Sequence, residues 1–287
     1  MPSDLNQNLA PGGPVDAAQV HRIAKRQSLI LTPGGFRHPS LVHHVDCDHE
    51  VHHSATSKRL RNMHTNEFRI LKEEMVRPGE VPAFGRGWIC YTSWMNETGS
   101  PITAFKTSWE VPPEPTTQGQ QTIFLFNGID PMNVSSSILQ PVLQWGRSGA
   151  GGGPFWSISS WYVAGDGHAY HTDLMRVDVG ERLVGLISLA DSQDGTFSYV
   201  CEFEGVAGTR LPVQNVPELK WCNETLEAYN ISQCSDYPAT SKTTFSDISV
   251  HTKTGPASVT WSNATIVSEC GQAAVVNASG TVDLRYA

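Results

Sequence analysis

The sequence predicts an all-β fold, an antiparallel β-sandwich with an extended N-terminal segment. From Trp88 onward, short runs rich in apolar and β-branched residues are separated by Gly, Pro, Asn and Asp, as in strands joined by turns. No helical pattern stands between these runs, so folds built on a parallel sheet are excluded. The run FWSISSWYV (155–163) alternates with a period of two, which places Trp156, Ser160 and Tyr162 on one face and Trp161 on the other.

Three parts of the chain differ in composition. Residues 1–28 are polar and rich in Pro, Gly and Asn, which indicates a flexible arm. Residues 29–84 are interpreted as an extension packed on the sandwich, with extended pieces around a Pro-Gly-Gly turn and one helix within 56–75. RPGEVPAFGRG (77–87) is interpreted as a linker, and residues 85–287 as the β-sandwich domain.

Composition and charge limit the classes of partner. Of the 287 residues, 39% are apolar, which is enough for a substantial core, and the net charge is −8. An acidic surface argues against nucleic acid and against acidic membrane surfaces. No apolar run approaches the roughly 20 residues of a membrane span. We therefore expect neither a nucleic-acid partner nor a membrane span.

Six cysteines are scattered along the chain without a Cys-x-x-Cys pair. Zinc sites usually contain such pairs, so three disulfides are expected, with their connectivity left open. The cysteines are Cys47, Cys90, Cys201, Cys222, Cys234 and Cys270.

Six Asn-x-Ser/Thr sequons favour a glycoprotein with N-linked glycans. They begin at Asn96, Asn133, Asn223, Asn230, Asn263 and Asn277. Together with the expected disulfides, they predict a secreted protein or one of the secretory pathway. The N-terminus lacks the apolar core of a signal peptide, so we expect that the signal peptide has been removed.

Histidines are concentrated between residues 38 and 64, many of them in HHVDCDHEVHH (43–53). A metal site needs three or four converging ligands, whereas neighbours in an extended segment point to opposite faces. We therefore expect no metal and no cofactor, and interpret this segment as polar surface around a disulfide. His168, in the loop DGHAYHTD, is a candidate for the mouth of a pocket.

The run ILQPVLQWG (138–146) is unusually polar for a buried strand. Alternation predicts Gln140, Val142 and Gln144 on one face, with Pro141, Leu143 and Trp145 opposite. Aromatic residues of neighbouring strands suggest an apolar groove with a few fixed polar groups, the usual composition of a small-molecule site. The residues expected to line it are Trp109, Phe124, Phe126, Trp156, Ser160 and Tyr162.

Short motifs carry a resemblance to the eqolisins, a family of fungal glutamic peptidases. SWEVPP, the LQ of Gln140, SWYV and LEAY occur in the eqolisin order across residues 85–287. The resemblance implies a concanavalin-like sandwich of two bent antiparallel sheets. It also implies that Gln140 and Glu227, or alternatively Glu224, activate water and stabilise an oxyanion. The chain departs from the pattern at Ser160, where eqolisins carry an acidic residue before the Trp-Tyr pair.

The overall layout also resembles secreted, glycosylated fungal β-sandwich proteins of natural-product pathways. These include hetero-Diels–Alderases, which join a tropolone quinone methide to a humulene-type sesquiterpene alcohol. The resemblance lies in chain size, sequons, cysteines and the series ILQPVLQWG, SSWYV and LEAYNISQCSDYP. It implies a pericyclase without a cofactor, in which a dry groove holds two small apolar substrates in near-attack geometry. Gln140, Gln144, Glu227 and Arg176 are then the candidate catalytic groups, with His168 at the rim.

Three functions are therefore compared below. The first is the pericyclase. The second is an eqolisin-like peptidase or other hydrolase that uses Gln140 and Glu227. The third is a non-catalytic sandwich that binds a ligand or glycan, because fold alone does not choose among these classes. A homodimer is compatible with all three.

Overall fold

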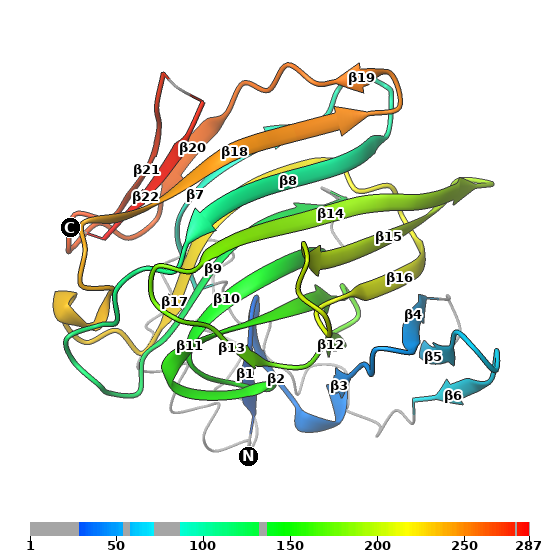
Figure 1. Cartoon of the computed structure of the whole chain (residues 1–287), viewed down its shortest axis with the longest axis horizontal. Coiled ribbons are helices and arrows are strands. Elements are labelled where there is room, and N and C mark those ends of the chain that lie inside the picture. Colours follow the sequence, from blue (N-terminus) through cyan, green and yellow to red (C-terminus); the bar gives the residue numbers. More distant parts are fainter. Residues whose placement is uncertain (1–28, 54–57, 72–86, 132–136, 279, 287) are drawn as a thin grey trace, which may run out of the picture.

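The protein is described by a computed structural model that covers residues 29–53, 58–71, 87–131, 137–278 and 280–286. The expected arm (1–28) and most of the expected linker (77–87) lie outside these residues. Two layers of strands form the molecule, and the antiparallel β-sandwich expected from the sequence is confirmed (Figure 1). Within the described residues the helices are single 3-10 turns, Pro39–Leu41 and Cys234–Asp236, and none is long and apolar enough to cross a membrane.

The first sheet contains the strand with the two glutamines. In spatial order it consists of β20 (Ser262–Thr265), β7 (Trp88–Met95), β17 (Trp221–Tyr229), β9 (Thr122–Asp130), β10 (Ile138–Ser148), β11 (Gly151–Val163), β12 (Ala169–His171) and β3 (Val42–His44), with β13 (Met175–Arg176) beside β11. Its pairs are antiparallel, except that β3 runs parallel to β12.

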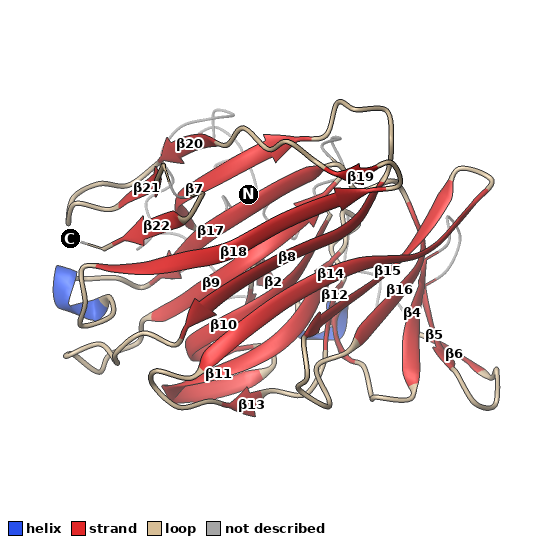
Figure 2. Ribbon diagram, turned by 45° about the horizontal axis from the view of Figure 1, so that its top comes forward, coloured by secondary structure: helices blue, strands red, loops and turns tan. Residues whose placement is uncertain are grey.

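The second sheet lies in front of the first in Figure 1 and is seen strand by strand in Figure 2. In spatial order it consists of β21 (Ala273–Val276), β22 (Val282–Arg285), β18 (Lys242–Thr252), β8 (Ile102–Glu110), β14 (Arg182–Gln193), β15 (Thr196–Phe203), β16 (Leu211–Val216), β4 (His49–His53), β5 (Lys58–Asn62) and β6 (Phe68–Ile70), with β19 (Gly255–Pro256) beside β18. Here β4 runs parallel to β16.

The space between the sheets holds the main core. Apolar side chains from the inner faces form one cluster around Trp109, Leu143 and Trp156 and a second around Tyr162 and Ile187. These side chains alternate along their strands with residues that face away from the second sheet, so β9, β10 and β11 are buried on both faces.

The outer face of the first sheet is covered by a small hairpin of β1 (Ile30–Thr32) and β2 (Gly35–Arg37). Its turn is the expected Pro-Gly-Gly turn, and Gly34 has φ +84°, which glycine adopts without steric cost. The first sheet bends around this hairpin. The turn of β10–β11 donates a hydrogen bond from Gly149 N to Leu31 O (2.6 Å), and a Cβ built on Gly149 would lie 3.0 Å from Val42 Cγ1, at the opposite edge of the sheet. We call this outer face the cup; its floor includes Phe124, Phe126, Gln140, Val142, Trp161 and Glu227.

In the described part of the range 56–75, residues 58–71, the expected helix does not form. Residues Lys58–Asn62 and Phe68–Ile70 are strands that continue the second sheet beyond β4. Leu60 is buried, whereas Arg59 and Arg61 beside it are partly exposed, so the segment has the alternation of a strand. Pairing with β4 outweighs the weak helical pattern of this segment.

The expectation of three disulfides is wrong in the structure. Cys234 and Cys270 form a disulfide, and Cys47, Cys90, Cys201 and Cys222 are free. Cys90, Cys201 and Cys222 are buried among apolar side chains, where a thiol packs as a small hydrophobic group. An even number of cysteines does not by itself bring any two of them to bonding distance.

One of the six sequons is also excluded as a glycan site in the folded protein. Asn223 is fully buried and accepts a hydrogen bond from Thr225 Oγ1, so no glycan fits there. Asn96 is nearly buried as well, with Nδ2 donating to Ser100 O. Asn263 is exposed, Asn230 and Asn277 are partly exposed, and Asn133 lies outside the described residues.

Candidate functional site

Strand β10 presents its side chains as alternation predicts. Val142 belongs to the apolar cluster of the cup, whereas Leu143 and Trp145 belong to the core between the sheets. Pro141 also faces inward, because a Cβ built on Gly185 of the second sheet would lie 2.8 Å from Pro141 Cγ. Gln140, Val142 and Gln144 therefore share the cup face, as expected.

Gln140 lies on the floor of the cup with its amide unpaired. The residue is 1% exposed, and neither Nε2 nor Oε1 has a hydrogen-bond partner. Trp161, its partner across β10–β11, also has a buried and unpaired donor at Nε1. Each such atom costs about 1–3 kcal/mol relative to a hydrogen-bonded state. The two residues are cross-strand partners, so two unpaired donors and one unpaired acceptor lie side by side on the floor of the cup.

The amide nitrogen of Gln144 has a structural task, whereas its Oε1 is buried and unpaired like the amide of Gln140. Its Nε2 donates to Gly146 O (2.8 Å) and to Gly151 O (3.0 Å), which closes the irregular end of the β10–β11 ladder. Gly152 lies against this amide, where a Cβ would approach Nε2 to 2.5 Å. Gly149 and Ala150 form the turn of this hairpin, and Gly151–Gly153 begin β11.

Glu227 lies on the cup face of β17, beside the hairpin. Its Oε1 accepts hydrogen bonds from Tyr229 Oη (2.5 Å) and from the backbone N–H of Gly34 (2.8 Å). Tyr229 Oη in turn accepts a hydrogen bond from Gly87 N (3.0 Å). The hairpin tip thus contacts the acid that the sequence singled out.

Burial shifts the pKa values of two groups beside Glu227, Tyr229 and Arg37. Burial raises the pKa of Tyr229 well above its ordinary value, and the charge of Glu227 adds to the rise, so the hydroxyl keeps its proton. Burial lowers the pKa of Arg37, while the charges of Tyr229, Glu227 and Asp166 act in the opposite direction. Arg37 thus brings a positive charge from the hairpin into the cup, and its Nε is buried without a partner.

Gln140 and Glu227 do not form a pair. In the register, Glu227 stands opposite Phe124, and Phe124 stands opposite Gln144, so Gln144 shares the row of Glu227. Gln140 lies four residues further along β10, about 13 Å of strand. No hydrogen bond joins the two side chains, because both amide atoms of Gln140 are unpaired.

Four of the residues expected to line the groove face the core instead. Trp109, Trp156, Ser160 and Tyr162 are buried between the sheets, Trp109 stacking on Phe245 with ring centroids 4.8 Å apart. The alternation predicted along β11 is correct, but the groove lies on its other face. Phe124 and Phe126 are on the cup face, as expected.

Glu224, the alternative acid, is also in the space between the sheets. It is fully buried, accepts a hydrogen bond from Thr107 Oγ1 (2.6 Å), and pairs across strands with Thr92 and Asn127. Burial raises its pKa well above the ordinary value of 4.5, so the carboxyl is held in its neutral form. It is closed off from the cup by the sheet itself.

The two residues expected at the rim have different positions. Arg176 is exposed at the edge of the first sheet, opposite Ser157, with its guanidinium 5.0 Å from the Phe155 ring centroid. His168 is buried, and its Nδ1 is 2.8 Å from Nε2 of His43. It therefore belongs to the seam between the extension and the sandwich.

That seam is rich in histidine. β3 pairs His43 with Tyr170 and His44 with His171, and Val45 N donates to His171 O (2.8 Å). Burial lowers the pKa of His43 to about 4, with further lowering by the charges of His168, Arg69 and His171 and an opposing effect of Asp166. Burial likewise lowers the pKa of His171 to about 4, the hydrogen bond to the Thr172 carbonyl opposing it. His44 contacts Asp173 (2.8 Å) and Asp46 (3.4 Å) on the outside.

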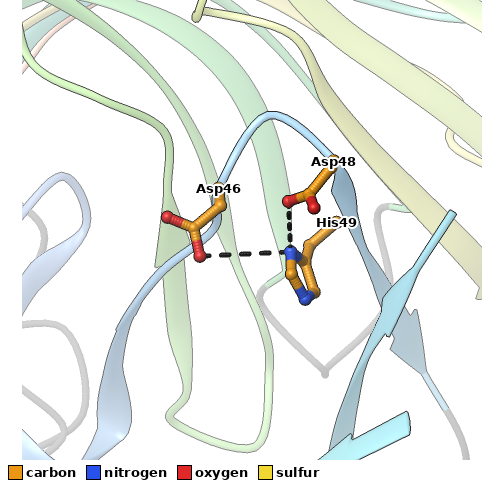
Figure 3. Close-up of side chains that lie close together, drawn as sticks. All are labelled: Asp46, Asp48 and His49. Atoms are coloured by element: carbon orange, nitrogen blue, oxygen red, sulfur yellow. Dashed lines mark hydrogen bonds and ion pairs between the residues drawn. The ribbon is translucent and has the colours of Figure 1, made fainter. Parts of the chain in front are cut away.

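A group with metal-like spacing lies in the turn before β4. One ligand atom each from Asp46, Asp48 and His49 falls within 4.8 Å of the others (Figure 3). His49 Nδ1 is already bonded to Asp48 Oδ1 (2.6 Å), and Asn62 Nδ2 donates to Asp48 Oδ2 (2.7 Å). These contacts account for the geometry as a turn stabilised by side chains.

Surface hollows lie away from the cup. One of about 590 Å³ is bounded by Trp109, Pro112, Arg182 and Thr244, and one of about 580 Å³ by Val250, Trp261 and neighbours. A smaller one of about 290 Å³ lies beside Gln121 and Arg147. None of these three hollows is lined by Gln140, Trp161 or Glu227.

Sequence reasoning missed four contributors to the cup: Trp161, Tyr229, Arg37 and Gly34. The position of Trp161 was predictable, because alternation along β11 places it on the same face as Ser157 and Ser159. It stands opposite Gln140 in the neighbouring strand. Arg37 and Gly34 had no local signal, since their position depends on how the extension folds back across the sheet.

No protein-family model matches the sequence, and no curated protein matches it. Solved structures similar to it include scytalido-glutamic peptidase with a peptide-based transition-state analog, at 15% identity and TM-score 0.46 over 70% of this chain and 98% of that chain. SCP-B, a member of the eqolisin family in complex with the tripeptide Ala-Ile-His, has 14% identity and TM-score 0.42 over the same shares. Alginate lyase vAL-1 from Chlorella virus has 8% identity and TM-score 0.30 over 62% and 79%. At such values the similarity indicates no function, so the proposals below depend on the residues of this chain.

Proposed function

We propose that this protein is a cofactor-independent cyclase, a hetero-Diels–Alderase that joins a tropolone quinone methide to a humulene-type sesquiterpene alcohol in the cup. The observation that carries the proposal is the pair Gln140 and Trp161, which holds three buried, unpaired polar atoms on an apolar, aromatic surface. Small-molecule sites have this composition, with few polar groups that fix orientation.

The chemistry needs little more than this. A cycloaddition between two apolar partners is accelerated when both are held in near-attack geometry, since their translational and rotational freedom is lost on binding. Gln140 Nε2 and Trp161 Nε1 would donate to the carbonyl oxygen of the heterodiene, which lowers the energy of the charge that develops there. Gln140 Oε1 would accept from the hydroxyl of the terpene alcohol. Phe126 and Val142 supply the apolar surroundings.

The peptidase is a weaker candidate. Activation of one water by Gln140 and Glu227 requires both side chains within hydrogen-bonding reach of that water. They lie in different cross-strand rows, and Glu227 is already engaged by Tyr229 and Gly34. If the protein nevertheless cleaves casein at acid pH and Glu227→Gln abolishes the cleavage, the peptidase replaces the cyclase.

The direct test measures product formation from a quinone methide precursor and a humulene-type alcohol. We expect the protein to raise the rate and to produce a single stereoisomer, resolved by chiral chromatography. Gln140→Leu should lower the rate at least tenfold, and Trp161→Phe, which keeps the ring but removes the N–H, should lower it less. Gln193→Leu, at an exposed position at the end of β14, is the matched control and should leave the rate unchanged. A rate and stereochemistry equal to the uncatalysed mixture would refute the proposal.

We also propose that the protein is a secreted glycoprotein. The support is the set of accessible sequons, with Asn263 exposed and Asn230 and Asn277 partly exposed. Mass spectrometry after enzymatic release of N-glycans from protein made in a secreting host should find modification at these positions and none at buried Asn223. Absence of glycan at all three accessible positions would contradict the proposal, and glycan at Asn223 would contradict the fold around β17.

A further inference from the structure

The β1–β2 hairpin occupies the cup by contacts of the kind a ligand makes. Gly34 N donates to Glu227 Oε1 (2.8 Å), and Leu31 O accepts from Gly149 N (2.6 Å). Leu31 and Phe36 are 8% and 6% exposed, and Phe36 packs edge-on against Tyr229 with ring centroids 5.7 Å apart. One backbone contact at each end and two apolar anchors hold the hairpin over Gln140 and its neighbours.

The hairpin is not built into either large sheet. Among the described strands, β1 and β2 pair with each other and with no other strand. The hairpin can therefore leave the cup without breaking a ladder of the sandwich. Segments held by few backbone hydrogen bonds open at a lower free energy than the core around them.

The floor beneath the hairpin remains incompletely satisfied while the hairpin is in place. Gln140 and Trp161 keep unpaired polar atoms, and Arg37 on the hairpin keeps an unpaired Nε. A ligand that brings one carbonyl and one hydroxyl oxygen to the floor would pair with groups that the hairpin leaves unpaired. Apolar surface is common to both occupants, so polar contacts decide between them.

We propose that the β1–β2 hairpin is an internal ligand of the cup that competes with the substrate: an apolar molecule carrying oxygen acceptors binds where the hairpin lies, and the hairpin is displaced. The inference rests on the proposed function for the identity of the substrate, but not for the competition itself. Because both occupants use one surface, binding of either weakens binding of the other by the same factor.

The first test uses the wild-type chain and 1-anilinonaphthalene-8-sulfonate as an apolar probe. Hydrogen exchange of the amides in Ile30–Arg37 is measured by mass spectrometry with and without saturating probe. We expect the probe to accelerate exchange of these amides at least tenfold while amides of β9 and β10 stay protected. Exchange of Ile30–Arg37 that is unchanged or slower with the probe bound would overturn the inference.

The second test weakens the hairpin without opening a hole in the cup. Gly34→Ala adds a Cβ whose nearest neighbour, Val163 Cγ1, is at 3.6 Å, so it fits, but φ +84° is unfavourable for alanine. The probe should bind about five- to tenfold more tightly. Gly99→Ala is the matched control, with φ +74° and nothing within 4 Å of its Cβ, in the turn between β7 and β8. Equal affinities of the two variants, or no binding by Gly34→Ala, would refute the competition.

The third test locks the hairpin. A Cβ on Gly149 would lie 3.2 Å from Ile30 Cδ1, so the two positions are neighbours, and thiols at Ile30→Cys and Gly149→Cys can be joined by a short cross-linker that attaches through reducible disulfides. The exposed Cys47 is replaced by Ser to prevent its reaction with the cross-linker. Cross-linking should weaken probe binding at least tenfold and mild reduction should restore it, whereas Cys47→Ser alone responds to neither. A locked protein that binds the probe normally would overturn the inference.

These outcomes separate the two proposals. Displacement of the hairpin by the probe without any cycloaddition would remove the cyclase and keep the competition. Cycloaddition that is equally fast in locked and unlocked protein would keep the cyclase and remove the competition.

Discussion

Glu224 and Glu227 lie three residues apart on β17, and the sheet separates them completely. Glu224 faces the second sheet, where one neutral hydroxyl, Thr107, contacts it and burial keeps its carboxyl protonated. Glu227 faces the cup, where Tyr229 and Gly34 donate to it and Arg37 brings a positive charge. The same residue type thus serves the core on one face and a candidate site on the other.

The difference lies in what covers each face. The inner face is covered by the second sheet, and the cup by a hairpin that, among the described strands, pairs with neither sheet. A polar group on the inner face can only be satisfied by the fold, whereas one in the cup can be satisfied by whatever replaces the hairpin.

Truncating a side chain in the core between the sheets should cost more stability than truncating one in the hairpin. Trp109→Ala removes a fully buried ring stacked on Phe245 and should lower the free energy of unfolding by about 3–5 kcal/mol. Leu31→Ala, in the hairpin, should cost less than about 1 kcal/mol in global unfolding, because the hairpin opens separately. Urea denaturation of both variants is the measurement. Similar losses would mean that the hairpin is part of the cooperative core.

The protonated Glu224 should make stability depend on pH. Its raised pKa means that the folded state keeps a proton that the unfolded chain releases above about pH 4.5. The contribution is therefore complete below that pH and is lost as pH rises, by up to about 1.4 kcal/mol per pH unit. Glu224→Gln does not titrate, so urea unfolding from pH 4 to 7 should show a smaller decline with pH than wild type. If the free energies of unfolding of wild type and Glu224→Gln change equally with pH, the Glu224 carboxyl is charged in the folded protein and the prediction is wrong.

Gln140→Leu should stabilise the fold while it removes activity. Replacing an unpaired buried amide by an apolar group of similar size should raise the free energy of unfolding by about 1 kcal/mol. Loss of activity with a gain in stability is the signature of a residue kept for function. Thermal unfolding gives the comparison, with Gln193→Leu as the exposed control. A destabilised Gln140→Leu would instead assign the amide to the fold.

Acid should loosen the histidine seam between β3 and β12. His43 and His171 have pKa values of about 4 when docked, below the ordinary 6.5, so the detached segment binds protons more readily. Docking is therefore complete above pH 6.5 and weakens as pH falls toward 4. Exchange of the Val45 amide, corrected for intrinsic rates, should speed up several-fold across this interval. His43→Phe should reduce the effect and His251→Phe, at an exposed position, should not.

Alternation along single strands predicted correctly which side chains share a face. It predicted which of Gln140, Pro141 and Trp145 share a face, since this depends on local backbone geometry alone. It did not say which face meets the second sheet, so Trp156 and Tyr162 were assigned to the groove and Trp161 was not. That choice depends on the packing of distant strands.

Long-range pairing explains the other differences. The sequence around Leu60, taken alone, fits a helix. In the structure it forms a strand because β4 pairs with it. Asn223 matches a sequon, but its burial depends on β7 and β9 on either side of β17. Cys90 and Cys222 were expected to be in disulfides of open connectivity, and the fold uses them as core side chains.

The parallel pairs β3–β12 and β4–β16 have a consequence for the order of events during synthesis. The extension leaves the ribosome first, but its partner strands lie more than a hundred residues later in the chain. Such distant pairs form late, because the intervening chain must be ordered first. We therefore expect the cup to be assembled open during synthesis, with Gln140 and Trp161 facing water until the extension closes over them.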